Sequence, residues 1–235
     1  HRQPYNIIYL ASAEEEVSGK DGISRVLPGL PQVSLAVVGE PTGMQPAIAE
    51  KGLMVIDGTA RGVSGHAARG EGVNAIYEAL DDLCWLRSYR FKRVSSLLGP
   101  TLMNVTVISA GTQHNVVPDE CKFTIDVRTN ELYTNEEVFG FIKSKLKSEV
   151  KARSFRLSSS GISADNPVVR RCVAMGMRPF GSPTLSDQAL MRFPSLKLGP
   201  GQSSRSHSAD EFILISEIDE AIKTYVNLLD GQQIC

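Results

Sequence analysis

Hydrophobic and polar positions alternate with two different periods in the middle of the chain. Apolar residues recur at every second position in four segments, which predicts strands, and at intervals of three and four in two others, which predicts helices. The strands are expected at 53–62, 101–108, 121–128 and 153–159, and the helices at 74–89 and 135–150, the second with Asn135 as its cap. The order β-α-β-β-α-β is that of a ferredoxin-like domain.

The segments on either side have a different pattern. Short apolar runs at 5–11 and 36–39 are typical of buried strands, and a short helix is expected between them at 22–30. A helix at 165–176, a short strand at 194–198 and an amphipathic helix at 215–229 complete the chain. We therefore predict an α/β fold, with one α/β domain in two parts, 1–51 and 161–235, interrupted by an inserted ferredoxin-like domain at 52–160.

Composition excludes several classes of protein. The 235 residues are 42% hydrophobic and 22% charged, which is enough apolar material for a sizeable core. The formal net charge is -1, whereas a generic nucleic-acid binder is usually basic, so no nucleic-acid partner is expected. The sequence has no run of about 18 apolar residues, so no membrane span is expected. Four scattered cysteines without a CxxC pair indicate a reduced, cytoplasmic protein.

Carboxylates follow the predicted strands of the outer domain. Glu14, Glu15 and Glu16 come after the apolar run at 5–11, and Glu40 comes after the run at 36–39. Active sites in open α/β sheets lie at the carboxyl ends of the strands. Adjacent carboxylates repel one another, and a cation among them would relieve that repulsion. Taken alone, each segment is better explained as a solvated acidic turn.

Histidines are few, and a lone histidine is more often a structural residue than a ligand. His207, however, follows a glycine-rich loop near the end of the same α/β domain. Together with Glu16 and Glu40 it makes a mixed imidazole and carboxylate set, which suits zinc or a related divalent ion. His66 and Asn115 lie in loops of the inserted domain.

Six motifs in order resemble the M20 family of co-catalytic metallopeptidases and deacylases, in particular its members that remove acetyl or succinyl groups from amino acids. They are Ala-Glu-Glu-Glu at 13–16, Val-Gly-Glu-Pro-Thr at 38–42, Gly-x-Ser-Gly-His at 62–66, Asn-Val-Val-Pro at 115–118, Asp-Val-Arg at 126–128 and Gly-Pro-Gly-x-Ser-Ser-Arg-Ser-His at 199–207. The resemblance covers essentially the whole chain. It implies a metal-dependent amide hydrolase that acts on a small N-acyl amino acid.

The resemblance also implies roles for individual residues. Glu15 matches the general base, and Glu16, Glu40 and His207 match ligands of two zinc ions, for which cobalt or manganese could substitute. His66 matches a histidine that one subunit of a homodimer supplies to the other subunit's site, where it stabilises the oxyanion. Asn115 matches a residue that contacts the substrate. Weaker candidates for holding the substrate's carboxylate are Arg128, Arg205 and the loop from Ser182 to Asp187.

The chain also departs from the family pattern. A His-x-Asp segment and a glycine-rich segment with a bridging aspartate precede the glutamate pair in the family, and this sequence lacks both. It also opens without an initiator Met or a basic leader. We therefore expect the chain to be the later part of a longer enzyme and to be inactive alone. The alternative is a non-catalytic fragment that acts in dimerisation or regulation.

Overall fold

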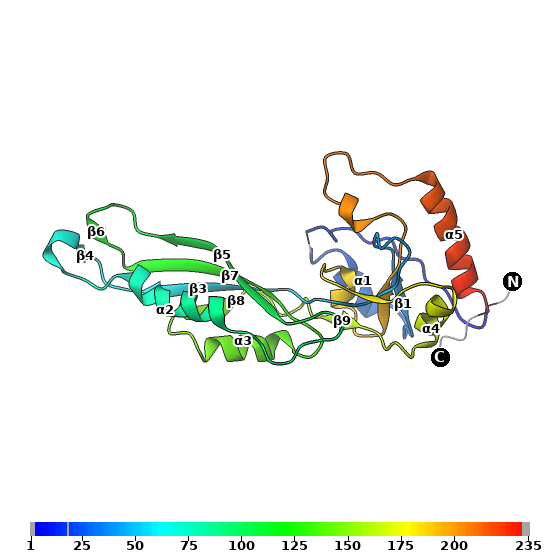
Figure 1. Ribbon diagram of the computed structural model, residues 1–235, viewed down its shortest axis with the longest axis horizontal. Coiled ribbons are helices and arrows are strands. Elements are labelled where there is room, and N and C mark those ends of the chain that lie inside the picture. The colour runs from blue at the N-terminus through cyan, green and yellow to red at the C-terminus, as the bar shows by residue number, and fades with distance from the viewer. Residues whose placement is uncertain (1–2, 18, 232–235) are drawn as a thin grey trace. The chain divides into compact units, whose positions relative to one another are not determined.

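The computed structural model describes residues 3–17 and 19–231. The chain divides into two compact units (Figure 1). The first unit comprises residues 1–50 and 160–235, and the second comprises residues 51–159. The domain boundaries that we predict from the sequence lie one residue further along the chain at both junctions.

The second unit is a four-stranded antiparallel sheet with two helices. Its elements are β3 (Met54–Arg61), α2 (Ala75–Ser88), β5 (Leu102–Ala110), β7 (Glu120–Arg128), α3 (Asn135–Lys143) and β8 (Glu149–Ala152). The strands lie in the order β5-β7-β3-β8, and each neighbouring pair is antiparallel. This is the ferredoxin-like arrangement, so the predicted fold class is confirmed.

The core of this unit follows from strict alternation along its two central strands. On β7, Phe123, Ile125 and Val127 are buried, and on β3 Met54 and Ile56 join them in one cluster. Gly58 on β3 makes room for that cluster, because a Cβ atom there would lie 2.2 Å from the ring of Phe123. The alternating pattern therefore fixes both the pairing register and the face that the helices cover.

Strand β5 lies at the edge of this sheet and is mostly exposed. Val107 is 58% exposed and Ile108 is 56% exposed, although both are strongly apolar. No strand in the described part of the chain pairs with the outer side of β5. Beyond the sheet, the short strands β4 (Gly65–His66) and β6 (Val116–Val117) pair with each other.

Three sequence-based expectations in this unit are wrong, and they concern the end of helix α3, the position of the fourth strand and the cap of α3. Helix α3 ends at Lys143 instead of continuing to residue 150, and the fourth strand is at 149–152 instead of 153–159. Beyond its end, the carboxylate of Asp82 accepts hydrogen bonds from the backbone N–H groups of Lys147 (3.0 Å) and Ser148 (2.8 Å), which takes these two groups out of any helical pairing. The cap of α3 is Thr134, in a capping box with Glu137.

Asn135, which we expected to cap that helix, has another role. Its side chain is buried and donates hydrogen bonds to the backbone oxygens of Phe155 (3.2 Å) and Leu157 (2.9 Å). These bonds hold the segment after β8 in an irregular path. A single buried amide thus satisfies backbone groups that we had assigned to a strand.

The first unit contains a mixed sheet in the order β1-β11-β2-β10, with β9 paired to β2. Its strands are β1 (Ala36–Val38), β2 (Ala47–Glu50), β9 (Ser160–Gly161), β10 (Phe180–Ser182) and β11 (Ser195–Lys197), and its helices are α1 (Ile23–Val26), α4 (Pro167–Ala174) and α5 (Ile215–Leu229). Val168 and Cys172 of α4 pack with Leu196, Leu198 and Leu228 in its core. Asn166 caps α4, and Pro167 occupies the first turn as predicted.

The predicted strand at 5–11 is absent. Residues 6–10 have no regular secondary structure, and Ile7 is 67% exposed and Tyr9 90% exposed. An apolar run predicts burial but does not supply the neighbouring strand that burial requires. The helix expected at 22–30 is also shorter: α1 gives way at Leu27 to a 3₁₀ turn that contains Pro28 and Gly29.

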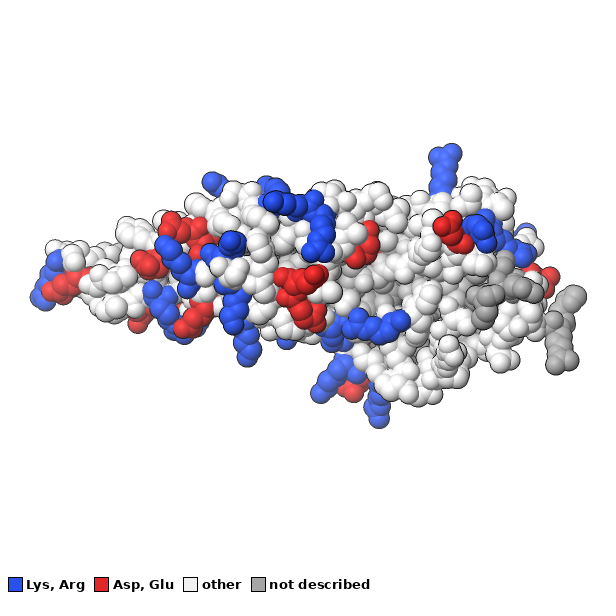
Figure 2. Space-filling model, turned by 90° about the horizontal axis from the view of Figure 1, so that it is seen from below, with Lys and Arg blue, Asp and Glu red and all other residues white. Residues whose placement is uncertain are grey.

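The surface carries both signs of charge. Figure 2 shows Lys and Arg side chains interspersed with Asp and Glu side chains across the visible face. Among the residues that the structure describes, no helix has the length and apolar composition needed to cross a bilayer.

Candidate functional site

Four carboxylates from three segments face a common region of the first unit, and we call them the acidic cluster: Glu15, Glu16, Glu40 and Asp187. Desolvation is the largest effect on Glu15, and the negative charges of Glu40, Glu16 and Asp187 add to it. Together they raise the pKa of Glu15 to about 7. The pKa of Glu40 is also raised, mainly by desolvation, and in part by Glu16 and Asp187. These mutual effects indicate that the four carboxylates lie within range of one another's charge.

The elements that carry these residues explain the convergence. Glu40 lies just beyond the end of β1, and Asp187 begins a short 3₁₀ helix, Asp187–Leu190. The hydroxyl of Ser12 donates a 2.6 Å hydrogen bond to Asp187, which links the segment before the glutamates to this helix. A Cβ atom on Gly199 would lie 2.5 Å from the backbone oxygen of Glu40, so glycine lets the loop after β11 approach Glu40.

His207 reaches this cluster from the loop before α5. Its Nε2 atom lies 3.8 Å from Oε2 of Glu16, and both side chains are exposed. The backbone of His207 is left-handed, with φ of 58°, and Glu14 is left-handed too, with φ of 61°. Left-handed backbone in residues other than glycine is strained and concentrates at functional sites. Three residues other than glycine have this conformation in the described part of the chain, and two of them, Glu14 and His207, lie beside the acidic cluster.

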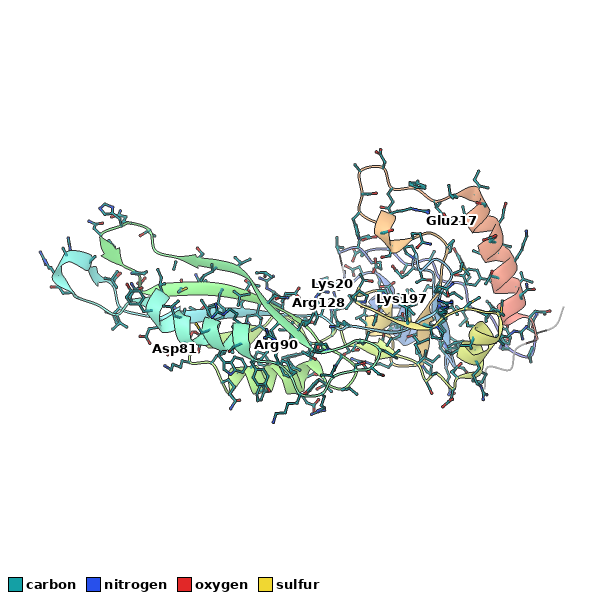
Figure 3. All side chains as sticks on the ribbon, viewed as in Figure 1. Lys20, Asp81, Arg90, Arg128, Lys197 and Glu217 are labelled. Carbon is teal, nitrogen blue, oxygen red and sulfur yellow. The ribbon has the colours of Figure 1, made fainter. Side chains whose placement is uncertain are left out.

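A buried ion pair next to this cluster is absent from our sequence-based predictions. Nζ of Lys197 on β11 lies 2.9 Å from Oε2 of Glu50 on β2. Lys197 is in register with Val38 of β1, two residues before Glu40, and its charge partly offsets the raised pKa of both Glu15 and Glu40. Figure 3 labels Lys197 within the sheet of the first unit. The only signal in the sequence is a lysine inside a short apolar strand.

The donor atoms suit zinc in kind but not in number. Carboxylate oxygen and imidazole nitrogen are typical zinc ligands. Within residues 3–17 and 19–231, however, no three His, Cys, Asp or Glu side chains gather closely enough to hold a metal ion. Glu16, Glu40 and His207 therefore do not form a complete metal site by themselves.

His66 and Asn115 lie together in the second unit, on the paired strands β4 and β6 and the turns beside them. The backbone N–H of Ala67 donates to the backbone oxygen of Asn115 (3.0 Å). Nδ1 of His66 accepts a hydrogen bond from the N–H of Ala68 at 3.2 Å. A neutral ring that accepts at Nδ1 carries its proton on Nε2. The exposed imidazole of His66 is therefore oriented as a hydrogen-bond donor.

The two candidate arginines already have partners. The guanidinium of Arg128 binds Asp126 through two atoms, at 2.7 and 3.0 Å. Nη1 of Arg205 binds Oε2 of Glu217 at 2.7 Å, and the guanidinium lies over the ring of Phe212. The guanidinium that we expected to hold a substrate carboxylate thus binds a carboxylate of this chain in both cases, through two nitrogens in Arg128 and through one in Arg205.

Comparison with known proteins identifies the second unit. A family model described as "Peptidase dimerisation domain", from the M20 family, matches residues 48–154. The chain is 29% identical to an acetylornithine deacetylase of Proteus mirabilis, over 94% of this chain and 62% of the relative. It is 26% identical to a succinyl-diaminopimelate desuccinylase of Magnetococcus marinus, over 97% of this chain and 66% of the relative.

Solved structures share the fold. A tripeptidase of Staphylococcus aureus superposes with a TM-score of 0.71 at 20% identity, over 91% of this chain and 61% of that chain. A dinuclear metal binding peptidase of the M20 family from Bacillus subtilis gives a TM-score of 0.67 at 17% identity, over 94% of this chain and 64% of that chain. The chain spans about three fifths of the length of the relatives it matches. These comparisons show that residues 48–154 match the dimerisation domain of M20 peptidases, and that the chain as a whole is similar to peptidases and deacylases of that family.

Proposed function

We propose that the protein to which this chain belongs hydrolyses the amide bond of an N-acyl amino acid. One observation carries the proposal. Separate segments bring Glu15, Glu16, Glu40 and Asp187 together, with His207 at 3.8 Å from Glu16. Amide hydrolysis needs a base for the attacking water and a means of stabilising negative charge on the carbonyl oxygen. The names of the relatives support this class of reaction.

Glu15 is the proposed general base. A base works best when its pKa lies near the working pH, and the surroundings of Glu15 raise its pKa to about 7. In this role Glu15 takes a proton from the attacking water and passes it to the nitrogen of the leaving amine. We propose that Asp187, which accepts a hydrogen bond from Ser12, orients a positively charged amino group of the substrate and does not hold its carboxylate as we expected, because two carboxylates repel each other.

We further propose that the protein depends on a metal, zinc first, with cobalt or manganese as substitutes. Glu16, Glu40 and His207 would contribute part of the donor set, and further ligands would have to join them. A bound divalent cation would polarise the substrate's carbonyl and activate water. It would also lower the raised pKa values within the acidic cluster, because opposite charge favours the ionised form.

The protein is proposed to act as a homodimer through its second unit. Strand β5 supports this, because its outer edge is unpaired within the described chain and carries exposed apolar side chains. Two such edges related by a two-fold axis can pair and form one continuous sheet. In that dimer His66 of one subunit would donate its Nε2–H to the oxyanion in the other subunit's site, with Asn115 beside it.

The favoured substrate is N-acetylornithine, which would place the enzyme in arginine biosynthesis in the cytoplasm. N-acetylcitrulline, N-succinylcitrulline and succinyl-diaminopimelate are alternatives, because a few loop residues decide acyl size and side-chain charge. The test is release of the free amine from each compound by the whole protein in zinc. Hydrolysis of one N-acyl amino acid, lost in Glu15→Gln, is expected. No release from any of them would reject the proposal.

A non-catalytic dimerisation fragment is the second candidate. It is favoured by the absence of a three-donor group among the described residues. Zinc titration and sedimentation velocity of the 235-residue chain distinguish the two. A dimer that binds no zinc and hydrolyses nothing would support the second candidate, and zinc-dependent hydrolysis would reject it.

A further inference from the structure

Arg205 joins the loop that carries His207 to the first turn of α5. Its Nη1 donates to Oε2 of Glu217 at 2.7 Å, and both side chains are largely shielded from solvent. The carbon of the guanidinium lies 4.6 Å from the centre of the Phe212 ring. Arg205 therefore holds two points beyond His207 at once, Phe212 in the loop and Glu217 on the helix.

Glu217 is itself fixed. The same Oε2 atom accepts a hydrogen bond from the backbone N–H of Leu214 at 2.9 Å, as an acidic residue in the first turn of a helix commonly does. Figure 3 labels Glu217 at the beginning of α5. The hydrogen bonds from Arg205 and Leu214 lower the pKa of Glu217. The anchor at the helix end is therefore a well-held carboxylate.

The backbone around His207 depends on the same loop. The hydroxyl of Ser208 donates to the backbone oxygen of Arg205 at 2.7 Å. The N–H of His207 donates to Oε2 of Glu211 at 3.1 Å. His207 has a left-handed backbone, which costs free energy and persists only when surrounding contacts enforce it. These contacts close a loop that runs from Arg205 to Glu217 and has His207 in its first part.

We propose that Arg205 is a positioning residue for His207, acting through Glu217 and Phe212, and not a ligand for the substrate's carboxylate. The inference rests on the proposed function insofar as His207 works beside Glu16. Nη1 of the guanidinium binds Glu217 and one face lies over Phe212, so the side chain is held within the chain from two directions. Loss of this clamp frees the loop, and His207 leaves its place near Glu16.

The first experiment measures how readily the loop around His207 opens, and it does not require an active enzyme. Amide hydrogen exchange of residues 203–212 is compared in the 235-residue chain and in Arg205→Met and Glu217→Gln. We expect exchange at His207 to rise about tenfold or more in both variants, because the local opening becomes easier. Arg61→Met is the matched control, since it removes a 2.7 Å ion pair with Glu120 in the second unit. Unchanged exchange in both variants overturns the proposal.

The second experiment measures catalysis in the whole protein. Arg205→Met and Glu217→Gln should each lower kcat by roughly 10–100-fold, the scale for a misplaced reacting group, with KM within about twofold. The double variant should be no worse than either single variant, because both remove one clamp. Arg205→Lys should recover part of the rate, since it keeps the ion pair but loses the planar stack.

A different kinetic result would show that Arg205 binds the substrate directly. A large rise in KM for Arg205→Met, with Glu217→Gln near normal, would identify Arg205 as a substrate ligand and overturn the proposal. A protein without hydrolase activity would reject the proposed function, while the exchange experiment would still decide the role of Arg205. Thermal unfolding of each variant excludes global unfolding as the cause, and Glu217→Gln serves if Arg205→Met does not fold.

Discussion

Nζ of Lys197 and Oε2 of Glu50 lie 2.9 Å apart, with 2% and 0% of their side chains exposed. The lysine also donates to the backbone oxygen of Thr184 (2.9 Å), and the glutamate accepts from the hydroxyl of Ser186 (2.8 Å). A pair so enclosed has lost the solvation of both charges. It therefore depends on its partners being present, and it ties the 184–186 segment, just before Asp187, to the sheet.

Replacement of one member of this pair should be far more damaging than replacement of both. Lys197→Met leaves Glu50 as an uncompensated buried charge, which costs about 3–5 kcal/mol of unfolding free energy. Combining Lys197→Met with Glu50→Met removes both charges and should recover most of that loss. Urea unfolding at pH 7 measures both values. A single variant as stable as the wild type would show that the charges are not buried together in solution.

Stability should also depend on the protonation of Glu15. Its folded-state pKa of about 7 lies above the ordinary value of 4.5. As pH rises from 4.5 to 7 the unfolded chain releases this proton first, so the group's contribution to the unfolding free energy falls over that window. Glu15→Gln cannot titrate and should lack this fall. Denaturation from pH 4 to pH 8 in a metal chelator tests this, and a wild-type-minus-variant difference that does not change with pH would contradict it.

Substitution of the two adjacent glutamates, Glu15 and Glu16, should affect zinc binding differently. In the whole protein, Glu15→Gln should lower kcat by about 10²–10⁴-fold, the usual contribution of a positioned base, and leave zinc content near that of the wild type. Glu16→Gln should lower zinc affinity. Chelation should abolish activity and zinc should restore it. If instead Glu15→Gln loses the metal, we have exchanged the two roles.

His66 should be needed by the neighbouring subunit. His66→Ala in the whole protein should cost about 10²–10³-fold in kcat, the scale for loss of one oxyanion donor. Mixing His66→Ala with Glu15→Gln subunits should restore part of the activity, because the hybrid dimer has one intact site. His114→Ala, in the next turn, is the control and should be near normal. No recovery, with subunit exchange verified, would place His66 outside the partner's site.

Charge on the edge strand should prevent dimer formation. Ile108→Lys on β5 places a charge on the proposed contact, and we expect sedimentation velocity to find a monomer with an unchanged circular dichroism spectrum. Val94→Lys changes another exposed apolar residue, away from this strand, and should remain dimeric. A dimeric Ile108→Lys variant would exclude β5 as the contact.

The sequence was informative wherever local periodicity decided the structure. Strands β3 and β7 and helix α2 have clear alternation or helical spacing, so their order and the ferredoxin-like arrangement were predictable. The periodicity was misleading where contacts between residues far apart in the sequence determine the local structure. Asp82, more than 60 residues earlier in the sequence, binds the backbone of Lys147 and Ser148 after α3. The run at 5–11 has no strand beside it among the described residues. The pair of Lys197 and Glu50 could not be found, since no spacing rule connects two separate strands.

Strand β5 also bears on the tendency of the chain to aggregate when nothing covers the edge of the sheet. Its nine residues, Leu-Met-Asn-Val-Thr-Val-Ile-Ser-Ala, contain no charge, no proline and no glycine. Uncharged segments of this kind with high β-propensity are the sequence signature of cross-β fibrils when an edge is open. In the proposed dimer a second copy would cover this edge, whereas a monomer would leave it open as a template for such pairing. Assembly would then protect the chain from amyloid as well as complete a site.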